Sequence, residues 1–347
     1  MSSSAPSTGS SPTLMPAVGY LRPLPVSDPS SLLDLELPVP TLRPHDLLVE
    51  VRAVSVNPVD VKQRTRAVPT GGPRVLGFDA SGTVRAVGPE VTLFAPGDDV
   101  FYAGSIDRPG TNSLLHAVDE RIVGPKPTSL DHTDAAALPL TSITAWETLV
   151  DRFRLGAAST GTLLVLGAAG GVGSVLVQLA RALTGLTVIG TASRPETAAW
   201  VREMGAHHVV DHSDKGALVA QVREIAPGGV THLFTPHSAG MVPTFAELLA
   251  PFGEITAIDD PGVADVAPLK AKSLTWHWEL MFTRPVQQTA DMITQHRLLA
   301  EVSRMVDAGV LRSTAQTRLA GIDAATLRHA HTLVESGRTI GKVVLTR

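Results

Sequence analysis

The sequence predicts an α/β protein in which a doubly wound parallel sheet is joined to a mostly antiparallel β domain. Strand and helix patterns alternate from about residue 138 to residue 275, which is typical of βαβ units on a parallel sheet. Residues 47–123 instead show short strand patterns between Pro/Gly turns. The chain has 347 residues, 44% of them hydrophobic, which is enough for two packed cores.

The β pattern of the first region comes from three segments. LLVEVRAVSV, ASGTVRAV and DDVFYA alternate or run apolar and are rich in β-branched residues. The turn signals VGPEV and APGDDV follow ASGTVRAV and precede DDVFYA. A mostly antiparallel domain follows from this order.

The periodicity changes at Pro139, where apolar residues begin to recur at helical spacing. Strands and helices then alternate, with right-handed crossovers expected between parallel strands. The expected elements are, in order, a helix at 139–155, the strand TLLVLG, a helix at 171–183, the strand TVIGTA, a helix in PETAAWVREMG, the strand HHVVDH, a helix at 215–225, the strand THLFTP, a helix at 242–249 and the strand EITAI.

The end of the chain is again rich in turns. We expect one helix from about Gln287 to Ala308 and a last strand at GKVVLT. We therefore predict one discontinuous domain from residues 15–137 and 276–347, with residues 138–275 inserted as the second domain. Residues 1–14, rich in Ser, Pro, Gly and Thr, are expected to form a disordered leader.

Composition excludes several classes of function. The chain has no cysteine, so it can form neither a disulfide nor a thiolate metal site, and a cytoplasmic location is expected. A net charge of −4 provides no basic surface for nucleic acid or for an anionic membrane. The longest nearly apolar stretch, 163–177, is short and interrupted by glycines, so no membrane span is predicted.

A glycine-rich loop joins the strand TLLVLG to the following helix. Ala168, Gly170 and Gly173 match the G/A-x-G-x-x-G pattern between a strand and a helix, which indicates a Rossmann dinucleotide-binding domain. Ala168 would allow a tight turn, Gly170 a close approach of pyrophosphate, and Gly173 close packing of helix on strand. The alternative is a turn that binds no ligand. The predicted cofactor contacts of this loop are Ala168, Ala169, Gly170, Gly171, Val172 and Gly173.

The segment after the second strand indicates which dinucleotide is bound. NAD sites usually place a carboxylate there, but the sequence reads GTASR, and Glu196 comes only after Pro195. Ser193 and Arg194 instead suit the 2′-phosphate of NADP, so NADPH is the predicted cofactor. The alternative is a solvated loop arginine beside a helix cap.

These motifs resemble the medium-chain dehydrogenase/reductase superfamily, in its zinc-independent quinone oxidoreductase branch and the bacterial zinc-type alcohol dehydrogenase-like group. The resemblance covers about residues 18–347. It rests on VSVNPVDVKQR, LGFDASGTVRAVGPEV, FAPGDDVFYAGS, LPLTSITAWETL, GAAGGVG, SLTWHWELMFTRP and LVESGRTIGKVVL.

The resemblance implies a GroES-like catalytic domain with the Rossmann domain inserted in it, a cleft between the two, and a homodimer. Metal-dependent members hold zinc through Cys, His and Cys. The corresponding positions here are Asn57, the Phe78–Asp79 pair and the vicinity of Leu140, none of which supplies a normal zinc ligand. We therefore expect no catalytic metal.

Four residues are candidates for catalysis. Asn57 stands in place of a metal ligand and could polarise a substrate oxygen, or it could be a turn residue. Asp60 and Lys62 could orient substrate or the nicotinamide ribose, or form an interdomain or surface ion pair. Tyr102 could donate a proton, or be a buried strand tyrosine.

Five further residues are candidates for the cofactor site. By resemblance, Thr141 and Thr144 lie on the nicotinamide side, with helix capping as the alternative. His212 could stack near the adenine ribose or be a loop histidine. Phe282 could wall the pocket or pack in a core. Lys342 could reach a cofactor phosphate or ribose, or be a solvated lysine at a strand end.

The predicted function is NADPH-dependent hydride transfer to a quinone or an α,β-unsaturated carbonyl compound without catalytic zinc. Without a Lewis acid, nothing stabilises the alkoxide of a simple alcohol, whereas hydrogen-bond donors can hold a developing enolate. A non-catalytic NADP(H)-binding redox sensor or structural protein is an alternative, and alcohol dehydrogenase-like activity is another. The chain contains neither G-x-S-x-G nor a P-loop motif, which excludes those chemistries.

Overall fold

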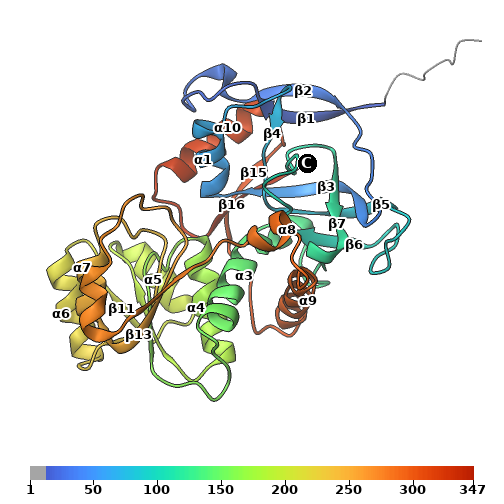
Figure 1. Cartoon of the computed structure of the whole chain (residues 1–347). Coiled ribbons are helices and arrows are strands. Elements are labelled where there is room, and N and C mark those ends of the chain that lie inside the picture. The colour runs from blue at the N-terminus through green and yellow to red at the C-terminus, as the bar shows by residue number, and fades with distance from the viewer. Residues whose placement is uncertain (1–12) are drawn as a thin grey trace, which may run out of the picture.

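The computed structural model describes residues 13–347, so the predicted leader lies almost wholly outside the described residues. Leu14, the last residue of the predicted leader, is the first residue of the first strand. The chain forms two domains, and the C-terminal elements return to the N-terminal domain: β15, β16 and α10, in red, lie beside β3 and α1, in blue (Figure 1). No helix within residues 13–347 is long and apolar enough to cross a membrane.

The nucleotide domain is built on a six-stranded sheet in which every neighbouring pair is parallel, as predicted. The strand order reverses at the central strand β9, which lies between β10 and β12. Such a switch point is where open α/β sheets bind their ligands. The strands, in spatial order, are β11 (His208–Val210), β10 (Thr187–Thr191), β9 (Thr162–Val165), β12 (Val230–Thr235), β13 (Leu249–Ala257) and β14 (Thr275–Trp278).

The helices predicted between these strands are present, because each carries an apolar stripe that packs on the sheet. The stripe of α4 is the clearest: Val175, Leu176, Leu179 and Ala180 are all buried. Strand β14 was not predicted and extends the sheet to Trp278, beyond the expected boundary at 275. The helices are α4 (Gly171–Leu183), α5 (Pro195–Glu203), α6 (Lys215–Ile225), α7 (Val242–Leu248) and the 3-10 helix η4 (Ala267–Lys272).

The second domain is a GroES-like β structure with mostly antiparallel pairing, as predicted. Strand β16 pairs antiparallel with β3, so the last residues complete a sheet that begins near the N-terminus. The large sheet runs β15 (Ala315–Ala320), β16 (Lys342–Thr346), β3 (Asp46–Val56), β5 (Ala80–Val87), β6 (Asp99–Tyr102) and β8 (Val123–Pro125), with β7 (Leu115–Asp119) also paired to β3. A small sheet contains β2 (Leu33–Pro38), β1 (Leu14–Tyr20) and β4 (Arg74–Val75).

The helix predicted from about Gln287 to Ala308 begins only at Thr294, because the preceding helix ends at Gln287 and the backbone of Gln288 is left-handed, with φ of 47°. Helix α3 also ends early and continues as a π-helical turn, η3. The helices outside the parallel sheet are α1 (Pro58–Arg66), α2 (His132–Ala135), α3 (Pro139–Trp146), η3 (Glu147–Arg152), α8 (Thr283–Gln287), α9 (Thr294–Asp307) and α10 (Ala324–Glu335), together with the 3-10 turns η1 (Pro29–Ser31) and η2 (Glu120–Ile122).

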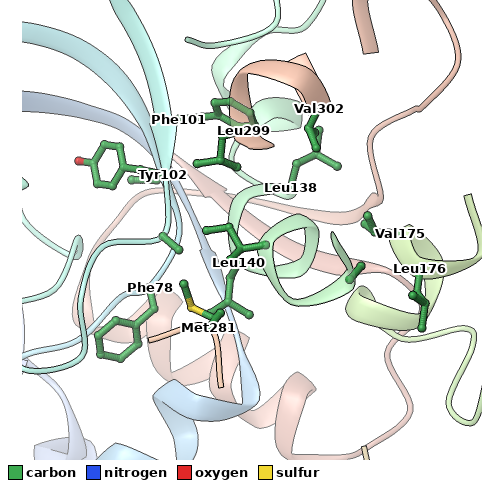
Figure 2. Close-up of a cluster of buried hydrophobic side chains, with 14 of the residues drawn as sticks. Phe78, Phe101, Tyr102, Leu138, Leu140, Val175, Leu176, Met281, Leu299 and Val302 are labelled. Atoms are coloured by element: carbon green, nitrogen blue, oxygen red, sulfur yellow. The ribbon is translucent and has the colours of Figure 1, made fainter. Parts of the chain in front are cut away.

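One hydrophobic core runs through both domains. It joins Phe101, Leu299 and Val302 of the catalytic domain to Val175 and Leu176 of α4, with Leu138 between them (Figure 2). A second core covers the other face of the parallel sheet, around Leu164 and Phe245. The domains are therefore packed against each other, and their junction is where the glycine loop meets the catalytic sheet.

Candidate functional site

The glycine loop follows β9 and leads directly into α4. Gly167 has a φ of 64°, which only glycine adopts easily, and Gly170 is the residue that caps α4. The left-handed residue of the turn is Gly167, and the role predicted for Ala168 in allowing the turn stays a prediction. Ala168 is fully buried under the loop.

Gly173 brings α4 close to the strand, as predicted. A Cβ at this position would lie 2.4 Å from the Gly167 carbonyl oxygen and 2.6 Å from the Ala168 Cα atom. Gly190 on the next strand serves the same purpose, because its Cβ would meet Val201 at 2.4 Å and Ala168 at 3.0 Å. No larger residue fits at either position without moving the loop.

The start of α4 fits a dinucleotide pyrophosphate. The helix has 13 residues, and its cap, Gly170, provides no side chain to accept the first backbone N–H groups. The N–H groups of Gly171, Val172 and Gly173 therefore remain available, at the positive end of the helix dipole. A Cβ at Gly170 would meet only the Gly167 carbonyl oxygen, at 3.4 Å, so the approach to this end is open.

Ser193 and Arg194 follow β10, where the adenosine ribose of a bound dinucleotide is expected. Arg194 forms an ion pair with Glu196, with Nε 2.8 Å from Oε1, and donates from Nη2 to the Arg338 carbonyl oxygen at 2.9 Å. His212 follows β11 and is exposed. Partial burial lowers the pKa of His212, which favours its neutral form.

Asn57 lies in a buried polar cluster at the domain junction. Its amide nitrogen donates to Asp79 Oδ2 at 2.8 Å and to the Phe78 carbonyl oxygen at 3.3 Å. Its amide oxygen accepts a short hydrogen bond from Lys342 Nζ. Both sides of the Asn57 amide are thus engaged within the protein, so the prediction that it polarises substrate directly is not supported by this geometry.

Asp79 is the centre of this cluster and is fully buried. Its Oδ2 atom accepts from Ser55 Oγ at 2.7 Å and from Lys342 Nζ at 2.8 Å, in addition to Asn57. Its Oδ1 atom accepts from the backbone N–H of Leu140 at 2.8 Å. We name Asn57, Asp79 and Lys342 the junction triad.

Lys342 reaches the triad from the last strand. Its neighbour Val343 pairs with Val56 in the antiparallel ladder, which places Lys342 opposite Asn57. Its stem lies against the glycine loop, since a Cβ on Gly171 would lie 2.7 Å from Lys342 Cδ. The ammonium group binds Asn57 and Asp79 and is buried, so Lys342 is not the solvated lysine of the alternative, and its phosphate or ribose contact stays a prediction.

Gly341 connects the glycine loop to this strand. It forms an isolated parallel bridge with Gly170, and its N–H donates to the Ala169 carbonyl oxygen at 2.8 Å. Its φ is 56°, and a Cβ would lie 2.2 Å from the Thr314 carbonyl oxygen. The residue before Lys342 is therefore glycine by necessity, and it fixes the lysine next to the dinucleotide loop.

Asp60 is buried close to the triad but serves as a helix cap. Its carboxylate accepts from the backbone N–H of Asn57 at 2.8 Å and of Gly77 at 2.9 Å. Burial raises the pKa of Asp60 to about 7, against the opposing effect of these two backbone donors. Both oxygens thus accept from backbone groups, and the substrate or ribose contact of Asp60 stays a prediction.

Two other catalytic candidates lie away from the triad. Lys62 is exposed on α1, two positions after the buried Asp60 and therefore on another side of the helix. Tyr102 is buried, stacks on His116 with ring centroids 5.5 Å apart, and lies 3.2 Å from its Nδ1 atom. The Tyr102 ring points away from Leu140 (Figure 2). The structure places both side chains apart from the triad, and their catalytic roles stay predictions.

Thr141 and Thr144 lie on α3, beside the glycine loop. Thr141 Cγ2 is 3.1 Å from the place of a Cβ on Gly171, so this residue is at the predicted side of the cleft. Both hydroxyls donate to carbonyl oxygens of the preceding turn, at 3.0 Å to Leu138 and 2.9 Å to Leu140. Because both hydroxyls bond carbonyl groups of the preceding turn, they do not cap the helix as the alternative supposed.

An apolar wall borders the triad. Phe282 packs edge-on against Phe78, with ring centroids 5.3 Å apart. Phe78, Leu140 and Met281 belong to one apolar cluster in Figure 2. Phe282 is buried in this cluster, as its alternative of core packing predicts, and its place at a pocket wall stays a prediction.

The residues at the family's metal positions do not fit zinc. Phe78 and Leu140 offer no ligand atom, and the amide oxygen of Asn57 already accepts from Lys342. The ammonium of Lys342 would also repel a bound cation. Within residues 13–347, no group of three His, Cys, Asp or Glu residues is arranged to hold a metal ion.

Sequence reasoning did not assign a role to Asp79 or Gly341. Asp79 was treated only as a replaced metal-site position, although a carboxylate inside the apolar run LGFDASG is an unusual feature that indicates a buried charge. Gly341 carried no such signal, because its partners Gly170 and Thr314 are distant in sequence.

Two family models match the chain. The alcohol dehydrogenase GroES-like domain matches residues 43–120, and the zinc-binding dehydrogenase model matches residues 171–291. The two matches fall in the β domain and the parallel-sheet domain, respectively, which agrees with the architecture described above.

Relatives of similar length exist in bacteria. A zinc-type alcohol dehydrogenase-like protein of Staphylococcus aureus is 42% identical over 340 residues, covering 95% of this chain and 99% of the relative. The crystal structure of a proposed zinc-dependent alcohol dehydrogenase from Rhizobium etli superimposes with a TM-score of 0.93 at 53% identity, covering 97% and 99% of the two chains. A quinone oxidoreductase of Pseudomonas syringae gives a TM-score of 0.82 at 25% identity, covering 96% and 100%. The chain is therefore an oxidoreductase that belongs to the medium-chain dehydrogenase/reductase superfamily, in its zinc-type alcohol dehydrogenase-like group.

Proposed function

We propose that this protein is an NADPH-dependent reductase that transfers a hydride to a quinone or an α,β-unsaturated carbonyl compound without catalytic zinc. The observation that carries the proposal is the junction itself. A helix end suited to pyrophosphate lies beside a buried cluster in which an ammonium group stands among the family's metal positions.

The cofactor assignment rests on the glycine loop and on Arg194. The loop fits the pyrophosphate, and the guanidinium of Arg194 lies at the end of β10 without a competing carboxylate from the strand itself. A mycobacterial structure complexed with NADPH, 25% identical with a TM-score of 0.82, supports a phosphorylated dinucleotide. To bind the 2′-phosphate, Arg194 has to exchange its ion pair with Glu196 for the phosphate oxygens.

The acceptor assignment rests on what the junction can stabilise. Reduced nicotinamide supplies the hydride when the cofactor is bound. The residues of the chain then have to hold the negative charge that develops on a substrate oxygen, and an apolar wall with one buried cation can do this. The quinone oxidoreductase of Pseudomonas syringae and a 2-methylene-furan-3-one reductase of Solanum lycopersicum, 34% identical over 190 residues, support this substrate class.

Oxidation of simple alcohols fits the junction less well. It would require a base and a Lewis acid for the alkoxide, and the residues at the metal positions provide no zinc ligands. We therefore place reduction of a conjugated carbonyl ahead of the dehydrogenase activity that the relatives' names suggest.

Coenzyme consumption tests the proposal directly. The purified chain is assayed with NADPH and with NADH against quinones, alkenals and simple aldehydes, each with and without a chelator. We expect turnover with quinones or alkenals, a preference for NADPH, and no effect of the chelator. Loss of activity on chelation that added zinc restores would contradict the metal-free reaction. Tight NADPH binding without turnover of any acceptor would favour a redox sensor.

A homodimer is part of the proposal. Strand β14 is the edge of the six-stranded sheet, and Trp278 on this strand is 53% exposed. An edge strand with an exposed aromatic side chain can pair with the same edge of a second copy. Light scattering of the eluted protein should give twice the monomer mass, and Trp278→Glu should shift it to the monomer.

A further inference from the structure

We propose that the ammonium group of Lys342 is the fixed cation of the active site, which holds the negative charge on the substrate carbonyl oxygen during reduction. It would thereby take the part that a metal ion plays in metal-dependent members of the superfamily. This inference rests on the proposed reductase function and names the residue that stabilises its oxyanion.

The position of Lys342 is the first argument. Its ammonium contacts Asn57 and Asp79, which stand at two of the positions that hold or adjoin the metal in metal-dependent members. The third position, Leu140, donates its backbone N–H to the same Asp79 carboxylate. These positions come from three distant segments that meet at Asp79, and Lys342 supplies the cation of the cluster.

The count of hydrogen-bond donors is the second argument. Both donors of the Asn57 amide are used, on Asp79 and on the Phe78 carbonyl oxygen. Lysine has three N–H donors, and within residues 13–347 two acceptors meet Lys342 Nζ: Asn57 Oδ1 and Asp79 Oδ2. One ammonium donor therefore remains for a substrate oxygen, whereas Asn57 has none.

The support of the lysine stem is the third argument. If Lys342 served only as a counter-ion for Asp79, its stem would not have to be held in one position, because the carboxylate also accepts from Ser55, Asn57 and Leu140. Yet the stem runs along Gly171, where a Cβ would lie 2.7 Å from Lys342 Cδ, and Gly341 ties the strand to the glycine loop. These contacts fix the cation beside the cofactor, where a substrate has to lie.

The chemistry needs no further reactant than the proposed function supplies. A hydride, with its two electrons, adds to the β-carbon of the conjugated carbonyl compound. The C=C pair moves to form a new double bond at the carbonyl carbon, and the C=O pair moves to oxygen. Lys342 donates a hydrogen bond to this oxyanion and keeps its proton. Water then gives a proton to the α-carbon, and the saturated carbonyl compound results.

A phenol probe reads the cation without turnover. 4-Nitrophenol, whose phenolate oxygen resembles an enolate oxygen, is titrated against the wild-type protein saturated with NADP⁺, and ionisation is followed by visible absorbance. We expect the pKa of the bound phenol to fall below its value in solution. No fall in the wild-type protein would overturn the proposal, and this measurement requires no variant to fold.

Kinetics of variants give the second test. Lys342→Met leaves the buried Asp79 carboxylate without its cation. It is therefore measured together with the double variant Lys342→Met/Asp79→Asn, which removes both charges. We expect both to lose ~100-fold to ~1000-fold in kcat, the usual effect of removing one oxyanion donor, with little change in the Kd for NADPH. Lys270→Met, at an exposed position, is the matched control and should behave as wild type.

The outcomes separate the possible roles. Wild-type kcat in the double variant would overturn the proposal, and so would weaker NADPH binding at unchanged kcat, which would indicate a cofactor contact. Restored turnover of Lys342→Ala by ethylammonium, but not by tetramethylammonium, would support a direct N–H donor. If the wild-type protein lowers the pKa of bound nitrophenol yet reduces no acceptor, the result would contradict the reductase function but support Lys342 as the cation that stabilises an oxyanion.

Discussion

The glycine loop and the junction triad touch each other but are built in opposite ways. The loop is one continuous segment, residues 167–173, and the bonds of Gly167, Gly170 and Gly173 act within it. The triad draws Asn57, Asp79 and Lys342 from three strand ends and closes only when the sheet forms. A local motif therefore indicates the cofactor, whereas the acceptor chemistry depends on long-range contacts.

The largest effect should come from the loop. Gly173→Ala places a Cβ 2.4 Å from the Gly167 carbonyl oxygen, so the loop has to move and the helix end loses its place. We expect NADPH binding to weaken by at least ~100-fold in calorimetry and stability to fall by about 1–3 kcal/mol. Gly228→Ala is the control, because nothing lies within 4 Å of its Cβ. Unchanged NADPH binding in Gly173→Ala would remove the loop from the cofactor site.

A smaller effect is expected at Arg194, which follows β10 and is proposed to contact the 2′-phosphate. Arg194→Ala should raise the Kd for NADPH by ~10-fold to ~100-fold, the range for a lost charge-assisted hydrogen bond, and leave that for NADH unchanged. Glu196→Gln should tighten NADPH binding, since the carboxylate competes for the same guanidinium. Equal effects of Arg194→Ala on both coenzymes would contradict the phosphate contact.

The carboxyl group of Glu279, which follows β14 and lies beside Glu147 of η3, should show itself in the pH dependence of stability. Burial, together with the hydrogen bond to Glu147, raises the pKa of Glu279 well above its usual value of 4.5. The folded state therefore binds a proton that the unfolded state has released, and stability falls as the pH rises above about 4.5.

Glu279→Gln replaces the protonated carboxyl group by an amide and should remove this dependence. We expect the variant to gain on the order of 2 kcal/mol relative to wild type between about pH 6 and pH 8 in urea unfolding. Glu224→Gln, which is exposed, should leave the slope unchanged. An equal slope in Glu279→Gln and wild type would show that other groups cause the pH dependence.

The smallest effect is expected at Tyr102, inside the catalytic domain but outside the triad. Tyr102→Phe loses the contact with His116 and should cost about 1 kcal/mol in thermal unfolding. Turnover should change by less than twofold, since the hydroxyl lies in the β core. A loss of ~100-fold in kcat would instead support a catalytic role of the Tyr102 hydroxyl.

The nucleotide domain could be predicted in detail because its signals are local. The stripe of α4 and the alternation of elements each depend on residues close in sequence, and the structure confirms both. Strand β14 was missed, since its short segment TWHW acquires strand pairing only beside β13. The break at Gln288 was missed because helical periodicity continues across it.

The candidate site could be predicted only in part. Asn57 was predicted to polarise substrate and Asp60 to orient substrate or ribose, but their partners were not known, and the structure shows both engaged within the protein. Lys342 was assigned to the cofactor site from its place in the terminal IGK segment, and the sequence did not show that its ammonium group meets Asn57 and Asp79. Asp79 received no role, although its buried carboxylate accepts the hydrogen bonds of Ser55, Asn57 and Lys342 that hold the cluster together.

The sequence alone determined the parallel-sheet domain and its glycine loop, because hydrophobic period and glycine spacing act over a few residues. The tertiary structure alone decided which buried charges meet. The pairing of β16 with β3 brings residue 342 opposite residue 57, and this contact spans almost the whole chain. Such a contact leaves no periodic trace, since it depends on which segments the fold brings together and not on any local backbone preference.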